Sequence, residues 1–357
     1  MRLISTFLLA LVLISYGRST KLDQRLSQEI ELGIQIEKLN SPVETSLRGI
    51  SVLSEDLAWL SGAKGSILRT VDGGKTWSLI PPPDNDSLDF RSIHAFSANS
   101  AIIASAGFPD RVYKTNNAGV SWNLVYENED SAAFINSIAF KNENLGIIMG
   151  DQLKGRHLIF RTSNGGDSWT RIDSNDVPKP FAVENAFAAS GSCIAISRSG
   201  RFFIGFGGEN SRVFSSINGL MWKAKSTPMM HGCSSCGIYS IASSGNGEIM
   251  AVGGDYTKPD SSHYPIVSLN DGKSWVRTTG RANGYRSVID YSNKIDSWLS
   301  AGLNGIDLSY DHGVTWEKIG ENNVNTLQFA PNSSVAFLGT KDGELLKMQI
   351  LLNESDK

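Results

Sequence analysis

The chain has 357 residues, of which 40% are hydrophobic and 19% charged, a composition that excludes an intrinsically disordered protein. The formal net charge of -3 at pH 7 excludes a general electrostatic attraction to nucleic acid or to anionic lipid. The length allows one large domain or two smaller ones.

Residues 1–17 have the layout of a secretory signal peptide. Arg2 precedes a mostly apolar run from Leu3 to Ile14, and small residues follow at Ser15 and Gly17. Because the run is too short to span a bilayer comfortably, we expect cleavage near Gly17, with an uncleaved membrane anchor as the alternative. The sequence therefore predicts an exported protein, in the periplasm, in the medium or, in a photosynthetic host, in the thylakoid lumen. No integral membrane segment is expected after removal of the signal, and residues 18–32 would be a lead-in.

A strand is predicted next, from Gly33 to Leu39, because GIQIEKL alternates apolar and polar residues. It has no predicted strand beside it in the chain. Its partner must therefore come from elsewhere.

An eight-residue motif then recurs six times, and its copies end at Trp77, Trp122, Trp169, Trp222, Trp275 and Trp316. The first copy reads TVDGGKTW, and an Asp or Asn stands five residues before the Trp at Asp72, Asn117, Asn164, Asn270 and Asp311. The acidic or amide side chain can accept bonds from its own turn, Gly supplies a positive φ, and Trp can pack on a sheet. We interpret the motif as a structural turn, and we expect a looser turn in the fourth copy, which has Ile217 at the Asp position.

The Trp-to-Trp intervals are 45, 47, 53, 53 and 41 residues, which fits about four short strands each. Sheets of this size bury their faces only by stacking on one another, which favours a β-propeller. After Trp316 three more strands are predicted, VNTLQFA, VAFLGT and ELLKMQI, without a further motif. With Gly33–Leu39 they would make a last blade, so we predict an all-β, seven-bladed β-propeller over residues 33–350, closed by the N-terminal strand, with a tail at 351–357.

The S/T-x-D-x-G-x-T/S-W repeat is similar to the Asp-box (BNR) repeat of sialidases and other propellers. With segments such as GISVLSEDLAWLSGAKGSILRTVDGGKTW and GIYSIA, the chain most resembles the photosystem II stability/assembly factor type of propeller, over about Leu47 to Ile350. This resemblance implies the propeller fold and the class of assembly factor or scaffold. A sialidase would carry Arg-Ile-Pro near its first strands, whereas this chain reads Leu47-Arg48-Gly49-Ile50, so a sialidase is disfavoured.

A candidate site follows from the repeat. If the boxes join the third and fourth strands of each blade, the loops that lead into the inner strands lie on the opposite face, here called the non-box face. Aligning the starts of the inner strands, such as LRGIS, FRSIH and INSIA, places one residue per blade at the mouth of the channel: Arg48, Arg91, Asn136, Asn185, Tyr239, Arg286 and Asn325. Three arginines without an acid predict a receptor for an anion or carboxylate. The alternative is that these residues only hydrate the channel.

The loops after the second strand are longer in blades three to five and face the same way. They carry a rim of mixed charge with aromatic residues: Asp151, Arg156, His157, Glu209, Asp255, Tyr256 and His263. Protein-binding surfaces have this composition, but such loops are also found as surface without a partner.

Cys233 and Cys236 form a C-x-x-C pair that leads into the fifth blade, after His231. In an oxidising compartment we expect a disulfide. A redox dithiol and a zinc site, with His231 and either His263 or Asp255, are the alternatives. Cys193 lies in an apolar run and is predicted to be a buried thiol. No cofactor and no metal site are predicted.

We therefore expect a monomeric, non-enzymatic exported propeller that binds a protein or peptide on its non-box face and not nucleic acid. The alternative is a carbohydrate-active enzyme, a glycosidase of sialidase-like type, with its site at the same channel mouth and carbohydrate as its ligand. No catalytic residue is predicted, because no acid and base of recognisable spacing occur.

Overall fold

The computed structural model describes residues 31–83 and 86–353, and within them every regular element is a β-strand. The chain divides into a large compact unit, Ile36–Gln349, and a small one that contains Met1–Gln35 and Ile350–Lys357. The expected signal peptide and nearly all of the expected lead-in lie outside the described residues. The ring of strands described next belongs to the large unit.

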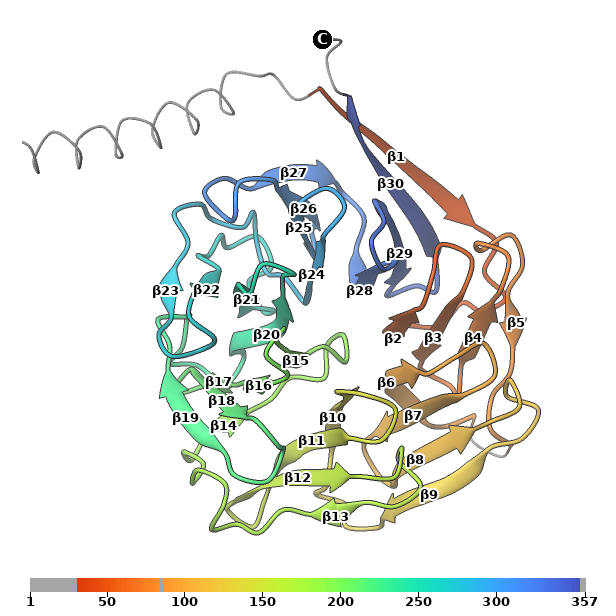
Figure 1. Cartoon of the computed structure of the whole chain (residues 1–357), viewed down its shortest axis with the longest axis vertical. Coiled ribbons are helices and arrows are strands. Elements are labelled where there is room, and N and C mark those ends of the chain that lie inside the picture. The colour runs from red at the N-terminus through yellow and green to blue at the C-terminus, as the bar shows by residue number, and fades with distance from the viewer. Residues whose placement is uncertain (1–30, 84–85, 354–357) are drawn as a thin grey trace, which may run out of the picture. The chain divides into compact units, whose positions relative to one another are not determined.

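Seven antiparallel sheets follow one another around a ring in chain order (Figure 1). Blade 1 consists of β2 (Leu47–Val52), β3 (Ala58–Gly62), β4 (Ile67–Thr70) and β5 (Ser78–Leu79). Blade 2 consists of β6 (Asp89–Ala95), β7 (Ala101–Ala106), β8 (Asp110–Thr115) and β9 (Asn123–Asn128). Blade 3 consists of β10 (Ile135–Phe140), β11 (Gly146–Leu153), β12 (Arg156–Thr162) and β13 (Thr170–Arg171).

Blade 4 consists of β15 (Ile194–Ile196), β16 (Phe202–Gly205), β18 (Arg212–Ser216) and β19 (Lys223–Ser226). Blade 5 consists of β20 (Cys236–Ser243), β21 (Ile249–Asp255), β22 (Ile266–Ser268) and β23 (Val276–Arg277). Two short strands, β14 (Glu184–Asn185) and β17 (Gly207–Gly208), extend the blade 5 sheet through the pair Gly207 and Gly237. Blade 6 consists of β24 (Val288–Ser292), β25 (Ser297–Gly302), β26 (Gly305–Ser309) and β27 (Glu317–Gly320).

The seventh blade closes the ring as predicted. Its sheet has the order β1-β30-β29-β28, with β28 (Val324–Phe329), β29 (Val335–Thr340), β30 (Leu345–Asn353) and β1 (Glu31–Leu39). Within the large unit, Lys38 of β1 forms an ion pair with Glu344, and Leu39 is buried against Gly74 of blade 1. The prediction of an all-β, seven-bladed propeller closed by the N-terminal strand is therefore confirmed.

The hydrophobic core is divided among the spaces between neighbouring blades. One cluster joins Trp59 of blade 1 to Phe90 and Ile103 of blade 2, and another joins Val112 of blade 2 to Ile148 of blade 3. Strand β3, AWLSG, is buried along its whole length because both faces of its sheet are covered. This is why a single blade of this sequence could not be stable alone.

The Asp-box turns are built as the sequence predicts. In the first, Asp72 Oδ1 accepts hydrogen bonds from the Thr70 hydroxyl at 2.8 Å and from Thr76 N at 2.9 Å, while Gly74 has φ +87°. The Thr76 donors, followed by Thr70, lower the pKa of Asp72 to about 2. Trp77 lies edge-on against Phe337 of blade 7, with ring centroids 6.1 Å apart, so this box also joins two blades.

The fourth box differs from the expectation. Ser216 ends β18 just as Thr70 ends β4, which shows that Ile217 is not at the Asp position. Asn218 takes that role, and its Oδ1 accepts from Leu220 N at 3.0 Å. Trp222 follows Ser216 by six positions, whereas Trp77 follows Thr70 by seven. The fourth turn is thus one residue shorter than the others and keeps an amide cap.

Candidate functional site

In five of the seven blades the start of the inner strand contains a bulge on the non-box face. The pairing register shifts across Arg48, Arg91, Asn136, Tyr239 and Asn325, and each of these five residues is the extra one. A bulge re-aims the side chain of its extra residue. These five predicted positions therefore share one level of the ring. Asn136, Tyr239 and Asn325 are buried there, while Arg48 and Arg91 are partly exposed.

Two of the seven predicted ring positions are wrong. In blade 6, Ile289 pairs with Ser300 at the level where Ile50 pairs with Leu60, so Ser287 and not Arg286 falls at the ring level. In blade 4 the inner strand is β15, and Asn185 lies in β14, beside Gly207. The sequence alignment failed because it set the segment YRSVI of blade 6 one residue out of register, with Arg286 where Ser287 belongs, and because blade 4 carries an insertion before its inner strand.

Arg286 is fully buried, and an acidic partner balances its charge. Its side chain is 0% exposed and forms an ion pair with Asp307 at 2.8 Å, and Nη1 donates to Asn304 Oδ1 at 2.6 Å. This arginine is committed to the packing of blade 6 and does not face a ligand on the surface.

The insertion of blade 4, Ala188–Ser192, crosses the channel and is here called the plug (Figure 1). Arg48 of blade 1 donates to Ala189 O at 3.2 Å, and Ser137 of blade 3 donates to Gly191 O at 2.5 Å. The hydroxyl of Ser190 donates to Ser287 O of blade 6 at 2.8 Å, and its carbonyl accepts from Thr326 of blade 7 at 3.4 Å. A segment of blade 4 thus lies across the channel and ties distant blades together.

The sequence contained one sign of this plug. The interval from Trp169 to Trp222 is 53 residues, compared with 45 for the first interval, and the surplus lies between the outer strand of blade 3 and β15. Small residues, AASGS, allow the close approach: a Cβ on Gly191 would lie 2.5 Å from the carbonyl oxygen of Arg91.

Arg48 is the cation at the ring level that lacks an acidic partner. Within residues 31–83 and 86–353 it forms no ion pair, and its Nε is buried without a hydrogen-bond partner. Burial, and next the neighbouring Arg91 cation, lower the pKa of Arg48 from its ordinary value. Arg91 differs, because it pairs with Asp89 at 2.7 Å and lies over the Phe134 ring. An anion would therefore find its strongest uncompensated positive charge at Arg48.

An aromatic cluster lies near this position, since Tyr285 and Arg48 each affect the pKa of the other. Phe187, next to the plug, stacks on Tyr239 with centroids 4.0 Å apart, and Tyr285 meets Tyr239 edge-on at 4.8 Å. Tyr256 completes the group and is 50% exposed. The site therefore combines a partly exposed guanidinium with aromatic surface, a composition typical of the centre of protein interfaces.

Several predicted rim residues turn out to be structural. His157 is buried between Phe206 and Phe214 and bonds to Glu184, which also pairs with Arg212. His263 is 3% exposed and accepts from Gly253 N at 3.2 Å. Asp255 is 6% exposed and accepts bonds from Ser235 and Thr257. These three residues hold the loops in place and are not free to contact a partner.

The remaining rim residues are spread apart. Asp151 accepts a bond from Asn136 at 2.8 Å, while Arg156, Glu209 and Tyr256 are exposed. The expected long loop of blade 3 is in fact a hairpin, since β11 and β12 extend to Leu153 and Arg156. Only Tyr256 of this group belongs to the aromatic cluster beside Arg48.

Cys233 and Cys236 form a disulfide where the chain leads into β20. The turn is anchored to the aromatic cluster, because Tyr239 donates its hydroxyl to Ser235 O at 2.7 Å. Cys193 is a free, buried thiol whose pKa burial raises to about 12. Within the described residues no group of three or more His, Cys, Asp or Glu side chains is arranged to hold a metal ion, and no helix is long and apolar enough to cross a membrane.

A buried carboxyl group near the ring was not predicted. Asp110 is 1% exposed, and its Oδ1 accepts from Ile135 N at 3.2 Å while Oδ2 has no partner. Burial raises the pKa of Asp110 from its ordinary value of 3.8 to about 7, and the nearby Asp151 acts in the same direction.

This group makes stability depend on pH. Between about pH 4 and pH 7 folded Asp110 keeps a proton that the unfolded chain has released, so the free energy of unfolding falls as the pH rises through this window. Asp110→Asn cannot ionise, and we expect it to be more stable than the wild type by about 1–2 kcal/mol at pH 8 and to lose this advantage near pH 4. Urea unfolding across pH measures the effect, with exposed Asp86→Asn as the control. An equal difference at both pH values would contradict it.

The ring of seven sheets, the box turns and the plugged channel define the protein as an Asp-box β-propeller with a cationic, aromatic centre on its non-box face. A family model described as Photosynthesis system II assembly factor YCF48 matches residues 30–349. The chain belongs to this family.

Solved structures with the same fold include one described as "YCF48 bound to D1 peptide", with a TM-score of 0.61 and 17% identity, covering 88% of this chain and 96% of that one. YCF48 from Cyanidioschyzon merolae has a TM-score of 0.63 and 17% identity, covering 88% of this chain and 98% of that one. No curated protein matches the sequence. At this identity the two structures establish the fold.

Proposed function

We propose that this protein is a non-enzymatic assembly factor or scaffold that binds a protein or peptide segment at the centre of its non-box face. The observation that carries the proposal is Arg48, a partly exposed guanidinium without an ion-pair partner among the described residues, set beside the cluster of Phe187, Tyr239 and Tyr256. Family membership supports it, as does the relative that was solved with a D1 peptide bound. We further propose that residues 1–17 direct export and that the protein acts there as a monomer.

The bound segment would present an acidic side chain or a terminal carboxylate to Arg48. A carboxylate accepts bidentate bonds from guanidinium, which gives direction as well as affinity. Arg91 is the second contact, although Asp89 already offsets part of its charge. Backbone and apolar side chains of the segment would lie on the aromatic rings, which supply contact area at low entropic cost.

The glycosidase alternative has less support. Of the carboxyl groups near the ring, Asp89 pairs with Arg91, Asp151 accepts from Asn136, and Asp255 accepts from Ser235 and Thr257. Asp110 is 1% exposed, so it does not face a ligand on the surface. A general acid and a nucleophile need two carboxyl groups facing a common sugar. The centre of the non-box face is instead cationic and aromatic.

Charge reversal at Arg48 tests the proposal. We expect Arg48→Glu to weaken binding of a D1 peptide, measured by isothermal titration calorimetry, by about tenfold or more, because a repulsive charge replaces an attractive one. Lys273→Glu, an exposed change on a box turn, is the matched control and should bind as the wild type does. A pull-down from the exported fraction with the same variants would extend the test to the native partner. Equal binding by Arg48→Glu and the wild type would remove this site from the mechanism.

A further inference from the structure

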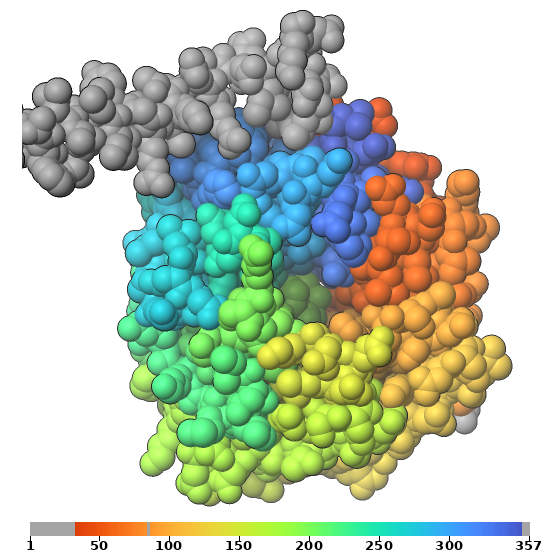
Figure 2. All heavy atoms as spheres, viewed as in Figure 1, coloured from red at the N-terminus to blue at the C-terminus, as the bar shows by residue number. Residues whose placement is uncertain are grey.

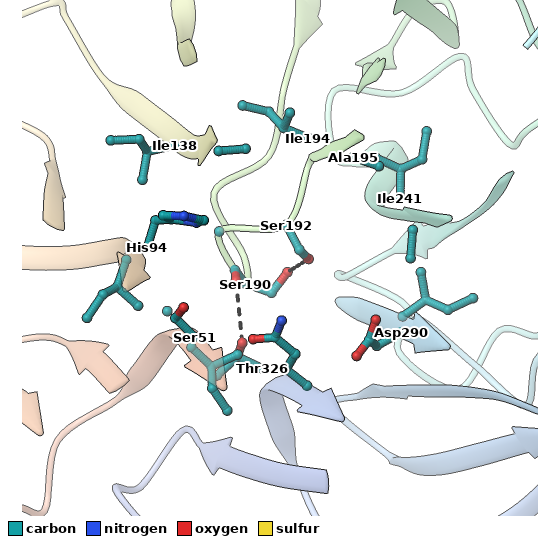
Figure 3. Close-up of a pocket in the computed structure, with 18 of the residues that line it drawn as sticks. Ser51, His94, Ile138, Ser190, Ser192, Ile194, Ala195, Ile241, Asp290 and Thr326 are labelled. Carbon is teal, nitrogen blue, oxygen red and sulfur yellow. Dashed lines mark hydrogen bonds between the residues drawn. The ribbon is translucent and has the colours of Figure 1, made fainter. Parts of the chain in front are cut away.

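A cavity of about 320 Å³ lies in the channel next to the plug. Figure 2 shows the hollow at the centre of the ring, and Figure 3 shows Ser190 and Ser192 of the plug with residues of the other blades around them. At one level the inner strands contribute one aliphatic side chain each: Ile50, Ile93, Ile138, Ile194, Ile241, Ile289 and Leu327. The residue that directly follows each of these seven in the chain lies one step farther from the ring level of Arg48. Together these next residues form a second level of the wall.

This next level is divided into two halves. Blades 3, 4 and 5 contribute Ala139, Ala195 and Ala242, whereas blades 6, 7, 1 and 2 contribute Asp290, Gln328, Ser51 and His94. Small apolar residues thus line one part of the cavity wall and polar residues the other; Figure 3 labels Ala195 of the first group and Ser51, His94 and Asp290 of the second. A ligand that fits both halves must have a polar end and an apolar body.

The polar half carries one uncompensated negative charge. Asp290 forms no ion pair within the described residues, and its Oδ2 accepts a hydrogen bond from Phe329 N at 2.8 Å. Asp290 is partly exposed, and it lines the cavity. Burial raises the pKa of Asp290 from 3.8 to about 6, and a cation beside it would offset that desolvation.

His94 also belongs to the polar half of the wall. It lies against Phe140 with centroids 5.0 Å apart, and in the part of the chain that the structure describes its ring nitrogens make no hydrogen bond. Burial lowers the pKa of His94 to about 4, so the ring is neutral at pH 7 and offers an acceptor nitrogen. The Gln328 side-chain oxygen is already used, because it accepts from Val52 N at 2.8 Å.

We propose that this channel cavity binds a primary alkylammonium group, with its nitrogen at Asp290 and its carbon chain against the wall of Ala139, Ala195 and Ala242. An ammonium group donates hydrogen bonds, which suits the Asp290 carboxylate, and the carbon chain would extend toward His94 on the other side of the cavity (Figure 3). A divalent metal ion fits poorly, because Ca²⁺ and Mg²⁺ take about six oxygen ligands and one carboxylate lines the cavity. The ammonium group can come from a free amine or from a lysine side chain of a partner.

The test uses n-butylammonium chloride as the probe and the histidine ring signals as the readout. The chain has five histidines, and His94 is the one that lines the cavity. We expect n-butylammonium to shift the ring NMR signal of His94 in a saturable way and to leave the other four in place. Butan-1-ol, which has the same chain without the charge, should bind about tenfold more weakly or not at all.

Two variants separate binding at Asp290 from other effects. Asp290→Asn keeps an acceptor for Phe329 N but removes the charge, and we expect it to weaken n-butylammonium binding about tenfold or more. Ala139→Leu fills the apolar half without touching Asp290 and should also abolish binding. Exposed Asp342→Asn is the matched control and should bind as the wild type does.

A second probe, the peptide acetyl-Gly-Lys-Gly-amide, distinguishes the two sources of the ammonium group. If it shifts His94 as n-butylammonium does, a lysine side chain can occupy the cavity; if only n-butylammonium binds, the ligand is a free amine. No shift of His94 with either probe, or unchanged binding by Asp290→Asn, would overturn the proposal. Because the cavity and the Arg48 site are tested with different probes, failure of one leaves the other standing.

Discussion

Replacing Arg286 by alanine is expected to lower the free energy of unfolding by about 3–5 kcal/mol. The change leaves Asp307, which is 0% exposed, as a buried carboxylate without its cation. The two remaining bonds to Asp307, both from Asn283, cannot replace the charge. Removing one partner of a buried ion pair costs far more than the pair itself contributes, because the other charge stays desolvated.

Urea unfolding at pH 7 measures this change, with Glu321→Ala as a control. Glu321 pairs with Lys318 on the surface at 2.6 Å, and we expect its loss to cost less than about 1 kcal/mol. The double variant Arg286→Met with Asp307→Leu should recover most of the lost stability, since no unpaired charge remains. A loss below about 1 kcal/mol for Arg286→Ala would show that Asp307 finds another partner or takes up a proton.

Gly191→Val is expected to displace the plug and to lower the free energy of unfolding by about 2–4 kcal/mol. Gly191 has φ +67°, and a Cβ there would lie 2.5 Å from Arg91 O and 3.2 Å from the Ser92 Cα. Both neighbours belong to a packed inner strand, so the plug has to move. The bonds from Ser137 to Gly191 O and from Arg48 to Ala189 O would then weaken.

Gly155→Val is the matched control for this prediction. Gly155 has φ +71°, but a Cβ added there would meet nothing within 4 Å, so the substitution reports backbone strain without a clash. We expect it to cost about 1 kcal/mol. Urea unfolding gives the stabilities, and faster amide hydrogen exchange at Ala188–Ser192 would identify displacement of the plug. Equal stability losses in the two variants would mean that the close packing of the plug contributes little.

The fold could be predicted because its signals are local and repeat. Each box carries its own hydrogen-bonding residues, as Thr70, Asp72 and Thr76 show, and the same spacing recurs along the chain. The unpaired strand that ends at Leu39 also pointed to closure, since it needed a partner that only the last three strands could supply. These inferences need the order of residue types and little knowledge of distant contacts.

The candidate site could be predicted only in part. Arg48, Arg91, Asn136, Tyr239 and Asn325 fall at the ring level because their blades share one spacing. Arg286, Asn185 and Ile217 were misplaced, because the blade 6 segment was aligned one residue out of register, blade 4 has an insertion, and the fourth box is one residue shorter. A change of one residue in a strand moves a side chain to the opposite face, which is why Arg286 is buried and Arg48 is not.

The amino-acid order alone determined the fold class, the number of blades and the closure of the ring. It also determined which loops form the non-box face, because all of these follow from short-range patterns. Only the tertiary structure decided which arginine lacks an ion-pair partner, that Ala188–Ser192 lies across the channel, and that Asp290 and His94 line one cavity. Ser190 and Ser287 bond across 97 residues of chain, and no local pattern specifies such a contact. The physical reason is that register and burial are set by hydrogen bonds and packing between blades, which exist only once the ring has closed.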